Sequence, residues 1–442
     1  MSFDYDILFL GGGLNYAGAV VASRAGLKTA LVEKKMEHLG GTCLHNGCIP
    51  SKMYLAAAET LYRSSKPFIE GALKLDMAKL DEEKEALLAR ATEAITKQCA
   101  KAELIAAEGK LVSPHTVEAD GKRYTAKHIV IGTGARPFIP EGIAYDGHSV
   151  ITSDEVLNMQ ALPEKIAIYG DGAIGLEMAS FFAAAGVETE LIWRHDTLLR
   201  RAHPLISQAL MEQMKRLGIR LSGNKSIATA KATKRGVHIV YDGGGEHYTP
   251  MLLVATGRRA VTDAVQTPEI AMDKHGIVTD MHFETTLADH YAIGDCNGKL
   301  QLAHAARAEV LYVVRRILGQ KPEPLDLSRV VRFIHTLPCS YAVAGKSRNE
   351  LEKEGVRYKE SVVPLRGLPF AVTHDGDGGV MAAFADEEGF LLGAELFAPH
   401  AEELVAIADM ALAGEMDAAT MRRTIMAHPT FSESLERALS KL

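Results

Sequence analysis

Residues 6–33 read DILFLGGGLNYAGAVVASRAGLKTALVE, which is the pattern of a strand, a glycine turn, a helix and a second strand. In such a unit the glycines allow a tight turn and the helix N-terminus faces a pyrophosphate. An acid about twenty residues after the turn accepts a hydrogen bond from a ribose hydroxyl. Glu33, at the end of the second apolar run, has this place. The stretch therefore predicts a dinucleotide-binding unit at the start of the chain.

A pair of cysteines, Cys43 and Cys48, follows within residues 40–52, GGTCLHNGCIPSK. One helical turn would bring their sulfurs within disulfide reach, and Gly47 would let the backbone pack close to a flat cofactor. A helix N-terminus and a cation such as Lys52 lower the pKa of a cysteine, which suits thiol–disulfide exchange. Two inert buried cysteines would not account for the flanking residues, and a structural zinc site needs a second Cys or His pair. We interpret the pair as a redox-active dithiol.

The same stretch resembles the active-site signature of the FAD-dependent pyridine nucleotide-disulfide oxidoreductases, among them dihydrolipoamide dehydrogenase, glutathione reductase and mercuric reductase. The resemblance implies an α/β fold with two Rossmann-like dinucleotide-binding domains and a C-terminal α+β dimerisation domain. The expected division is an FAD-binding domain with the dithiol over residues 1–150, an NAD(P)H-binding domain over 151–262, a return to the FAD domain over 263–324 and a dimer-interface domain over 325–442.

The first glycine turn departs from the family pattern. Relatives usually continue with two more glycines, whereas this chain has Leu14, Asn15 and Tyr16, and the span to Glu33 is one residue short. Asn tolerates the left-handed backbone region, so we expect Asn15 to stand in for one glycine. A bulky residue near the helix start would alter the fit of the pyrophosphate.

A second copy of the unit starts at residue 166 and contains an intact Gly-x-Gly-x-x-Gly pattern, Gly170, Gly172 and Gly175. An apolar run precedes the glycines and a helical pattern follows them, which is the context that makes the motif specific. Two dinucleotide sites beside a dithiol imply that electrons pass between two cofactors and the sulfurs.

The residues after the second strand of this unit bear on the choice of nucleotide. An NAD site would place Asp or Glu there for the ribose hydroxyl, whereas a 2′-phosphate needs cations. The chain has Trp193 in that place, followed by Arg194, His195 and, further on, Arg200. A basic surface loop would have similar composition, but these three residues resemble the NADPH-binding residues of glutathione reductase. The resemblance therefore implies NADPH, with NADH as the alternative.

Later segments also match family motifs. Residues 129–135 resemble a strand beside the flavin, residues 252–258 echo it, and Asp295 resembles the acid that binds the ribityl chain. Residues 325–442 mix short strands at 330–334, 380–384 and 391–394 with a helix at 402–412, as expected of a dimer-interface domain. The cofactor contacts that the resemblance implies are Gly11, Gly13, Glu33, Gly41, Thr42, Lys52, Thr133, Gly134, Asp295, Leu302, Ala303 and His304 for FAD, and Gly170, Gly172, Ile174, Gly175, Arg194, His195, Arg200 and Gly257 for the pyridine nucleotide.

The end of the chain contains His428-Pro429-Thr430 and Glu433, which resemble the family's His-Pro-Thr-x-x-Glu signature. The resemblance implies that NADPH reduces the flavin, which reduces the Cys43–Cys48 disulfide. Cys48 would form a charge-transfer pair with the flavin, and Cys43 would attack the substrate disulfide. The remaining implied roles are proton management by His428 and Glu433 of the other subunit, tuning of the flavin by Lys52, and pairing of Glu177 with Lys52.

Composition fits a soluble enzyme. The chain has 442 residues, 47% hydrophobic and 24% charged, and its net charge of −7 offers no basic footprint for nucleic acid or an anionic membrane. No apolar run has membrane-spanning length, and five cysteines do not suggest a secreted disulfide scaffold, so we expect a cytoplasmic protein. The C-terminal Ser440-Lys441-Leu442 would be a peroxisomal address in a eukaryotic host. We expect no metal ligands.

Several functions remain open. The first is an NADPH-driven reductase of a small disulfide, working as a homodimer with shared active sites. Val20 stands where glutathione reductases carry an arginine, and no vicinal cysteines end the chain as in mercuric reductases. An NAD-dependent dihydrolipoamide dehydrogenase, acting on a lipoyl group, is the nearest alternative. The altered turn at Leu14 leaves a third, a nucleotide-binding redox sensor of low turnover.

Overall fold

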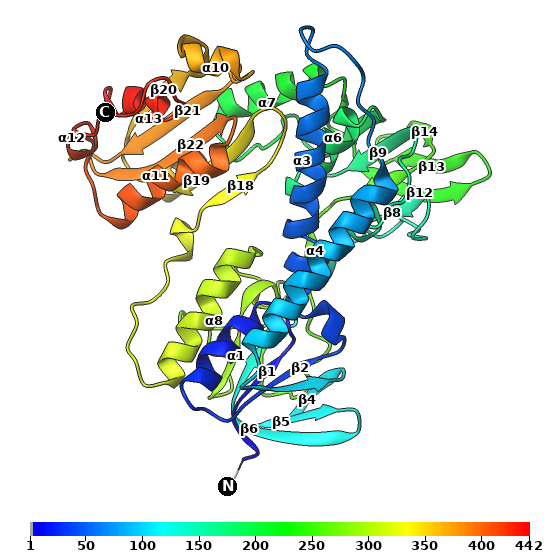
Figure 1. Ribbon diagram of the computed structural model, residues 1–442, viewed down its shortest axis with the longest axis vertical. Coiled ribbons are helices and arrows are strands. Elements are labelled where there is room, and N and C mark those ends of the chain that lie inside the picture. The colour runs from blue at the N-terminus through cyan, green and yellow to red at the C-terminus, as the bar shows by residue number, and fades with distance from the viewer. Residues whose placement is uncertain (1–2) are drawn as a thin grey trace. The chain divides into compact units, whose positions relative to one another are not determined.

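The computed structural model describes residues 3–442 as two compact units (Figure 1). Each unit is assembled from three separate stretches of the chain. The first comprises Met1–Met53, Ala78–Phe138 and Arg258–Leu327, and the second Tyr54–Met77, Ile139–Gly257 and Ser328–Leu442.

The first unit contains a parallel sheet that is apolar on both faces. Ile7, Leu8 and Phe9 are completely buried, as expected of a strand covered on both sides. A β-meander extends the sheet beyond β6. The parallel strands in spatial order are β3 (Glu103–Ala106), β2 (Thr29–Glu33), β1 (Tyr5–Leu10), β6 (Lys122–Ile131) and β17 (His290–Ala292), and the meander adds β5 (Thr116–Ala119) and β4 (Gly109–Ser113).

Helices α1 (Asn15–Arg24) and α8 (Ala303–Ile317) lie side by side on one face of this sheet (Figure 1). Val20 of α1 and Val310 of α8 share one apolar cluster with Phe9, and α4 (Met77–Gln98) adds Leu88 to it. Other elements of this part of the chain are η1 (Met36–His38), α2 (Gly41–His45), α3 (Cys48–Ser64), β7 (Ala135–Pro137), β16 (Arg258–Ala260) and η2 (Gly294–Asn297).

The second unit contains a parallel sheet of the same kind. Its glycine turn lies between β9 and α6 (Ala173–Ala184), and α7 (Pro204–Arg216) follows later in the chain. The strands in spatial order are β11 (Arg220–Ser222), β10 (Glu188–Ile192), β9 (Lys165–Tyr169), β15 (Leu252–Val254) and β8 (Val150–Ile151), and a separate antiparallel sheet contains β12 (Ile227–Thr233), β13 (Gly236–Tyr241) and β14 (Glu246–Thr249).

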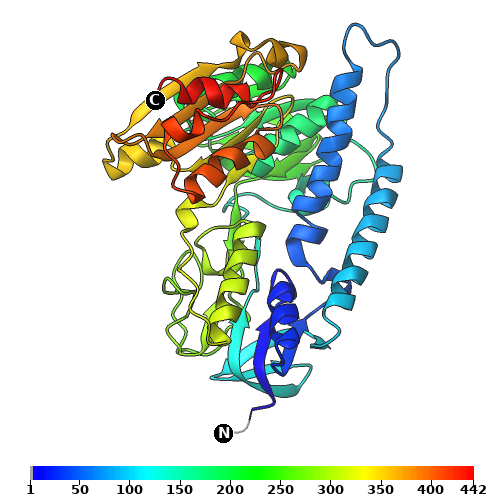
Figure 2. The same ribbon diagram turned by 60° about the vertical axis from the view of Figure 1, so that its left-hand side comes forward.

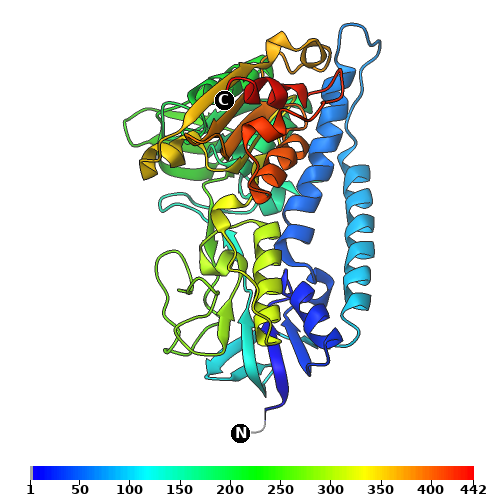
Figure 3. The ribbon, with the colours of Figure 1, turned by 90° about the vertical axis from the view of Figure 1, so that its left-hand side faces the viewer.

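The last third of the chain forms an antiparallel sheet in the second unit. Helices α11 (Ala401–Ala413) and α13 (Glu433–Leu439) cover one of its faces, where their alanines and leucines pack against small residues of the strands (Figures 2 and 3). The strand order is β18 (Arg332–Ile334), β19 (Ser340–Gly345), β22 (Leu391–Ala398), β21 (Val380–Ala385) and β20 (Lys359–Pro364). The remaining short helices are α5 (Ser153–Val156), η3 (Leu327–Arg329), α9 (Arg348–Glu354), η4 (Leu365–Gly367), α10 (Pro369–Thr373) and α12 (Ala418–Met421).

The expected α/β class, with two parallel sheets and a C-terminal α+β part, is confirmed, while the four-part domain division stays a prediction. One strand is longer than the apolar pattern indicates, because β22 continues through the buried Glu395. Its carboxylate accepts hydrogen bonds from the backbone N–H groups of His203 and Arg348 and from the hydroxyl of Tyr341, each at 2.9 Å. Within residues 3–442, no helix is long and apolar enough to cross a membrane.

The glycine turn of the second unit gives a direct test of this packing. A Cβ on Gly175 would lie 1.9 Å from the carbonyl oxygen of Gly170, whereas a Cβ on Gly172 would meet nothing within 4 Å. We expect Gly175→Ala to lower the free energy of unfolding by roughly 1–3 kcal/mol. Gly172→Ala is the matched control and should cost less than about 1 kcal/mol. Urea denaturation followed by circular dichroism measures both, and equal losses would contradict the packing argument.

Candidate active site

The two cysteines of the dithiol lie on two helices. Cys43 is within the short helix α2, Cys48 is the first residue of α3, and Asn46 and Gly47 separate the helices. The expectation that one helical turn joins the sulfurs is therefore wrong. A Cβ on Gly47 would lie 2.7 Å from the carbonyl oxygen of Thr42 and 3.3 Å from Cα of Cys43. Gly47 thus lets the backbone fold tightly back on Cys43, whereas we had expected its small size to serve contact with a cofactor.

The thiol of Cys43 holds its proton more tightly than an ordinary cysteine. Its hydrogen bond with Cys48 is the largest cause of the raised pKa, and burial is the second. The lowered pKa that we predicted for the dithiol therefore does not apply to Cys43. Cys48 instead occupies the N-terminus of a long helix, where the macrodipole favours negative charge.

Lys52 and Glu177 belong to different units. Lys52 lies in α3, one turn after Cys48. Glu177 lies in α6, where it is buried and accepts a hydrogen bond from the backbone N–H of His335 at 3.0 Å. Their pairing, and the role of Lys52 beside a flavin, stay predictions.

The first glycine turn fits a bound FAD. Gly11 has a positive φ of 99°, a Cβ on Gly13 would meet nothing within 4 Å, and the turn leads into the N-terminus of α1. Glu33 accepts hydrogen bonds from the backbone N–H of Gly12 at 2.7 Å and of Lys35 at 3.2 Å, which fixes its carboxylate at the turn. An open turn with donors at a helix N-terminus is suited to a pyrophosphate, and a fixed carboxylate is suited to a ribose hydroxyl.

Asn15 replaces a glycine in a way that we did not expect. It is the first residue of α1, and it does not use the left-handed backbone conformation that we predicted for it. Its side chain is completely buried, and Nδ2 donates to the carbonyl oxygens of Leu10 at 3.3 Å and Val130 at 3.2 Å. The side chain therefore points into the sheet and ties the helix start to two strands.

The second set of predicted flavin contacts lies at η2 and at the start of α8. Burial raises the pKa of Asp295, and the positive charge of Arg258 opposes this effect. Leu302 is the N-cap residue of α8, and Ala303 and His304 open the helix. The hydroxyl of Thr133 donates to the carbonyl oxygen of Val261 at 2.5 Å. The contacts of these residues with FAD stay predictions, as do those of Gly41, Thr42 and Gly134.

Glu309 holds the turn that carries Asp295, and we did not predict this residue. Its Oε2 accepts hydrogen bonds from the backbone N–H of Gly294 at 2.7 Å and from Nδ2 of Asn297 at 3.0 Å. The side chain is completely buried, and burial raises its pKa to about 7. A sequence signal existed, because Glu309 shares the helical spacing of the apolar residues Ala306 and Val313 on the buried face of α8.

The second glycine turn fits a pyridine nucleotide for the same reasons as the first fits FAD. Gly170 has a φ of 128°, Gly172 leaves open space, and Gly175 packs directly on the turn at the start of α6. Ile174 lies in the first turn of α6, and Gly257 leaves open space at a φ of 112°.

Trp193 occupies the position of the missing acid at the end of β10. Its side chain is only 1% exposed, and a Cβ on Gly223 would lie 2.7 Å from the indole ring. Arg194 and Arg200 are exposed and make no ion pair within residues 3–442, and His195 is half-buried. The loop after β10 therefore presents two unpaired guanidinium groups.

His428 and Glu433 form a pair near the C-terminus. Nδ1 of His428 lies 2.9 Å from Oε1 of Glu433, and the other carboxylate oxygen accepts from the backbone N–H of Thr430 at 3.0 Å. The hydrogen bond to His428 is the largest cause of the lowered pKa of Glu433. The side chain of His428 is 73% exposed, so Nε2 is accessible.

The other three cysteines have packing roles. Cys99, Cys296 and Cys339 are buried, and burial raises the pKa of each thiol, in Cys296 to about 11. Among the residues that the structure describes, no group of three or more His, Cys, Asp or Glu side chains is placed to hold a metal ion.

Comparison with known proteins identifies the family. Residues 5–309 match the model for pyridine nucleotide-disulphide oxidoreductases, and residues 331–439 match the dimerisation domain of the same enzymes. The chain belongs to the pyridine nucleotide-disulphide oxidoreductase family. It is 32% identical to the dihydrolipoyl dehydrogenase of Bacillus subtilis, over 99% of this chain and 98% of that protein. It is 28% identical to a mercuric reductase of Bacillus cereus, over 99% of this chain and 71% of that protein.

Solved structures share the fold over the whole chain. LpdA from Mycobacterium tuberculosis superimposes with a TM-score of 0.90 at 23% identity, covering 98% of both chains. Membership confirms the predicted class of enzyme, with Cys43 and Cys48 as the redox-active pair. It also implies FAD and a pyridine nucleotide as cofactors and a role in dimerisation for the C-terminal sheet.

Glu309 predicts a pH effect on stability. Because the pKa of this carboxyl is raised from 4.5 to about 7 on folding, its contribution to stability is complete below pH 4.5 and is lost as the pH rises through 7. Glu309→Gln keeps an acceptor for Gly294 and Asn297 but cannot ionise. Between about pH 5 and about pH 8 we expect the wild type to lose roughly 3 kcal/mol of unfolding free energy relative to the variant. Urea titrations at several pH values measure this difference, and parallel pH profiles would rule out a raised pKa.

Proposed function

We propose that this protein is an NADPH-driven reductase of a small disulfide. The observation that carries the proposal is the end of β10, where the buried Trp193 replaces an acid and the unpaired Arg194 and Arg200 follow. A carboxylate there would accept from the ribose 2′-hydroxyl of NADH and repel a 2′-phosphate. Two guanidinium groups instead offer the forked donors that bind phosphate well.

The proton transfers of the proposed reaction follow from the raised pKa of Cys43 and from the orientation of His428 by Glu433. When bound, FAD and NADPH supply the hydride chemistry that reduces the Cys43–Cys48 disulfide. Cys43 then keeps its proton at neutral pH, because its pKa is raised, and it needs a base before it can attack. His428 of the partner subunit would be that base, since Glu433 binds Nδ1 and leaves Nε2 to accept the proton.

Two successive thiol–disulfide exchanges at Cys43 would reduce the substrate disulfide. Cys43 gives its proton to Nε2 of His428, and its thiolate attacks one sulfur of the substrate disulfide. The substrate S–S bond breaks, a mixed disulfide forms on Cys43, and the leaving thiolate takes the proton from His428. The thiolate of Cys48 then attacks the Cys43 sulfur, which restores the Cys43–Cys48 disulfide and releases the second thiol after protonation.

A second candidate is an NAD-dependent dihydrolipoamide dehydrogenase, in which the same residues would carry the reaction in the opposite direction, from a dithiol substrate to the nucleotide. The support for it is the 32% identity to the dihydrolipoyl dehydrogenase of Bacillus subtilis over nearly the full length of both chains. An anaerobic titration of the FAD-loaded protein with NADPH, and separately with NADH, distinguishes the two. Loss of flavin absorbance at lower NADPH than NADH supports the reductase, faster reduction by NADH supports the dehydrogenase, and no reduction by either would leave only a redox sensor of low turnover.

The basic loop makes a quantitative prediction. The double variant Arg194→Ala/Arg200→Ala should raise the KM for NADPH by roughly 30–100-fold, because each guanidinium makes a charge-assisted hydrogen bond to the phosphate. The KM for NADH should change little. Lys234→Ala, in the exposed turn between β12 and β13, is the control for loss of a positive charge. Equal effects on the two nucleotides would contradict the proposed phosphate contacts.

The role of His428 is tested by separating the two half-reactions. His428→Gln should lower turnover of disulfide roughly 10²–10⁴-fold, because the raised pKa of Cys43 leaves little thiolate without a base. The rate of flavin reduction by NADPH in stopped flow should be unchanged. His148→Gln, at an exposed histidine elsewhere in the second unit, is the control. Normal turnover in His428→Gln would exclude this residue as the base.

A further inference from the structure

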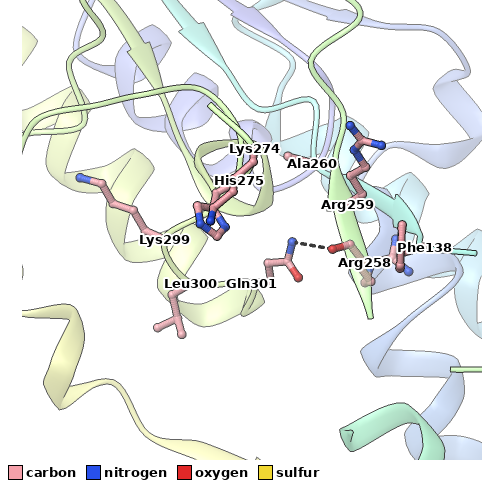
Figure 4. A pocket seen from close by; sticks show the side chains of 10 residues that line it. Phe138, Arg258, Arg259, Ala260, Lys274, His275, Lys299, Leu300 and Gln301 are labelled. Atoms are coloured by element: carbon pink, nitrogen blue, oxygen red, sulfur yellow. Dashed lines mark hydrogen bonds between the residues drawn. The ribbon is translucent and has the colours of Figure 1, made fainter. Parts of the chain in front are cut away.

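A cavity of about 550 Å³ lies in the first unit (Figure 4). Its walls come from four stretches of the sequence: Phe138 directly after β7, the strand β16, the loop before Gly276 and the loop that follows η2. The volume is in the range of sites that bind small molecules, roughly 300–1,000 Å³. Arg258 and Gln301 adjoin the predicted cofactor contacts Gly257 and Leu302, but no sequence motif accounts for the other cations of the lining.

The lining of the cavity is strongly cationic. Four of its ten residues are Arg258, Arg259, Lys274 and Lys299, a fifth is His275, and none is acidic. Two acids on neighbouring segments have other partners. Asp263 pairs with Arg136 at 2.9 Å, and the carboxylate of Asp273 accepts from the backbone N–H groups of His275 at 2.7 Å and Gly276 at 3.0 Å. The lining itself therefore carries a net positive charge, although the carboxylate of Asp273 lies near Lys274 and that of Asp295 near Arg258.

The cations of the lining differ in how many hydrogen bonds and ion pairs they already make within the chain. Lys299 donates to the carbonyl oxygen of Asp280, and its ammonium lies 5.2 Å from the centre of the Phe283 ring, on the side away from Gln301 (Figure 4). Arg258 donates to a backbone carbonyl through one nitrogen, while its Nε is buried and has no partner among residues 3–442. Arg259 and Lys274 are exposed and make no ion pair in the described part of the chain.

The walls are fixed before any ligand binds. A Cβ on Gly276 would lie 2.3 Å from the carbonyl oxygen of Cys296, and the N–H of Ile277 donates to the same oxygen at 2.8 Å. Across the cavity, Nε2 of Gln301 donates to the carbonyl oxygen of Arg258 at 3.4 Å (Figure 4). Because these contacts hold β16, the loop before Gly276 and the loop after η2 together, a ligand would meet a preformed cluster of cations and lose little affinity to reordering.

We propose that this cavity binds a small organic polyanion, with two or more phosphate or carboxylate groups. Arg259 and Lys274 would bind the anionic groups, because guanidinium and ammonium are the donors that phosphate and carboxylate prefer. The volume exceeds that of a single phosphate, so several anionic groups can be neutralised at once. Phe138 and Leu300 give the lining an apolar part for the carbon skeleton of the ligand. The inference does not depend on which nucleotide the enzyme uses.

Calorimetric titration of the full-length, FAD-loaded protein tests the proposal, in parallel runs with saturating NADP⁺ and with saturating NAD⁺, so that the nucleotide site is occupied whichever coenzyme the enzyme uses. Pyrophosphate and citrate are the probes, one for phosphate and one for carboxylate. We expect saturable binding of at least one probe, weakened by added salt. Arg259→Gln/Lys274→Gln should weaken it by about tenfold or more for each cation removed. The single variant Lys274→Gln, at an exposed loop position, gives the same test if the double variant folds poorly.

The control removes two exposed lysines of the same unit, Lys110→Gln/Lys122→Gln, and changes the net charge equally. Binding of pyrophosphate alone, citrate alone or both, with loss only in the cavity variants, supports the site and names the anion class. The proposal is overturned if neither probe binds, if the control loses as much affinity as the cavity variant, or if either NADP⁺ or NAD⁺ abolishes binding, which would make the cavity part of the nucleotide site.

Discussion

The dithiol depends on backbones that approach each other without intervening side chains. A Cβ on Gly41 would lie 2.7 Å from Cα of Gly13, and a Cβ on Gly11 would lie 2.5 Å from the carbonyl oxygen of Gly132. Gly41 is also the first residue of the helix that carries Cys43. The same close contact therefore seats the first glycine turn against the segment that carries the dithiol. A side chain at any of these glycines would displace the nucleotide turn and the cysteines together.

Two buried carboxylates organise the loops around this framework. Glu309 binds the turn of Asp295, and Glu395 binds the backbone before α7 and at the start of α9. Burial raises the pKa of both acids, because a desolvated carboxylate is costly unless hydrogen bonds compensate for the lost water. Each acid accepts backbone N–H groups that would otherwise be buried without a partner. Glu309 and Glu395 thus fix the loops that they bind, and the fold in turn raises the pKa of both acids by burying them.

The features that could be predicted from the sequence are those that depend on residues close together in the chain. Both strand–turn–helix units and the cysteine pair follow from glycine spacing and apolar runs, which local sterics determine. The inward rotation of Asn15 and the burial of Glu309 were missed, because both depend on acceptors and donors that only the folded sheet brings close. The cationic cavity could not be predicted at all, since Arg259, Lys274 and Lys299 are separated in sequence and only the loops' packing gathers them.

Coenzyme choice and fold are decided by different numbers of residues. A TM-score of 0.90 at 23% identity means that the fold is shared while most residues differ. In dinucleotide-binding units, by contrast, the choice of coenzyme depends on the end of one strand and the loop after it. Trp193 is buried there because Gly223 leaves room for the indole ring, and this burial removes the position from which a carboxylate would reach the ribose. Arg194 and Arg200 follow in this loop and make no ion pair among residues 3–442, and the proposed preference for a phosphate rests on this local charge, separately from the packing of the fold.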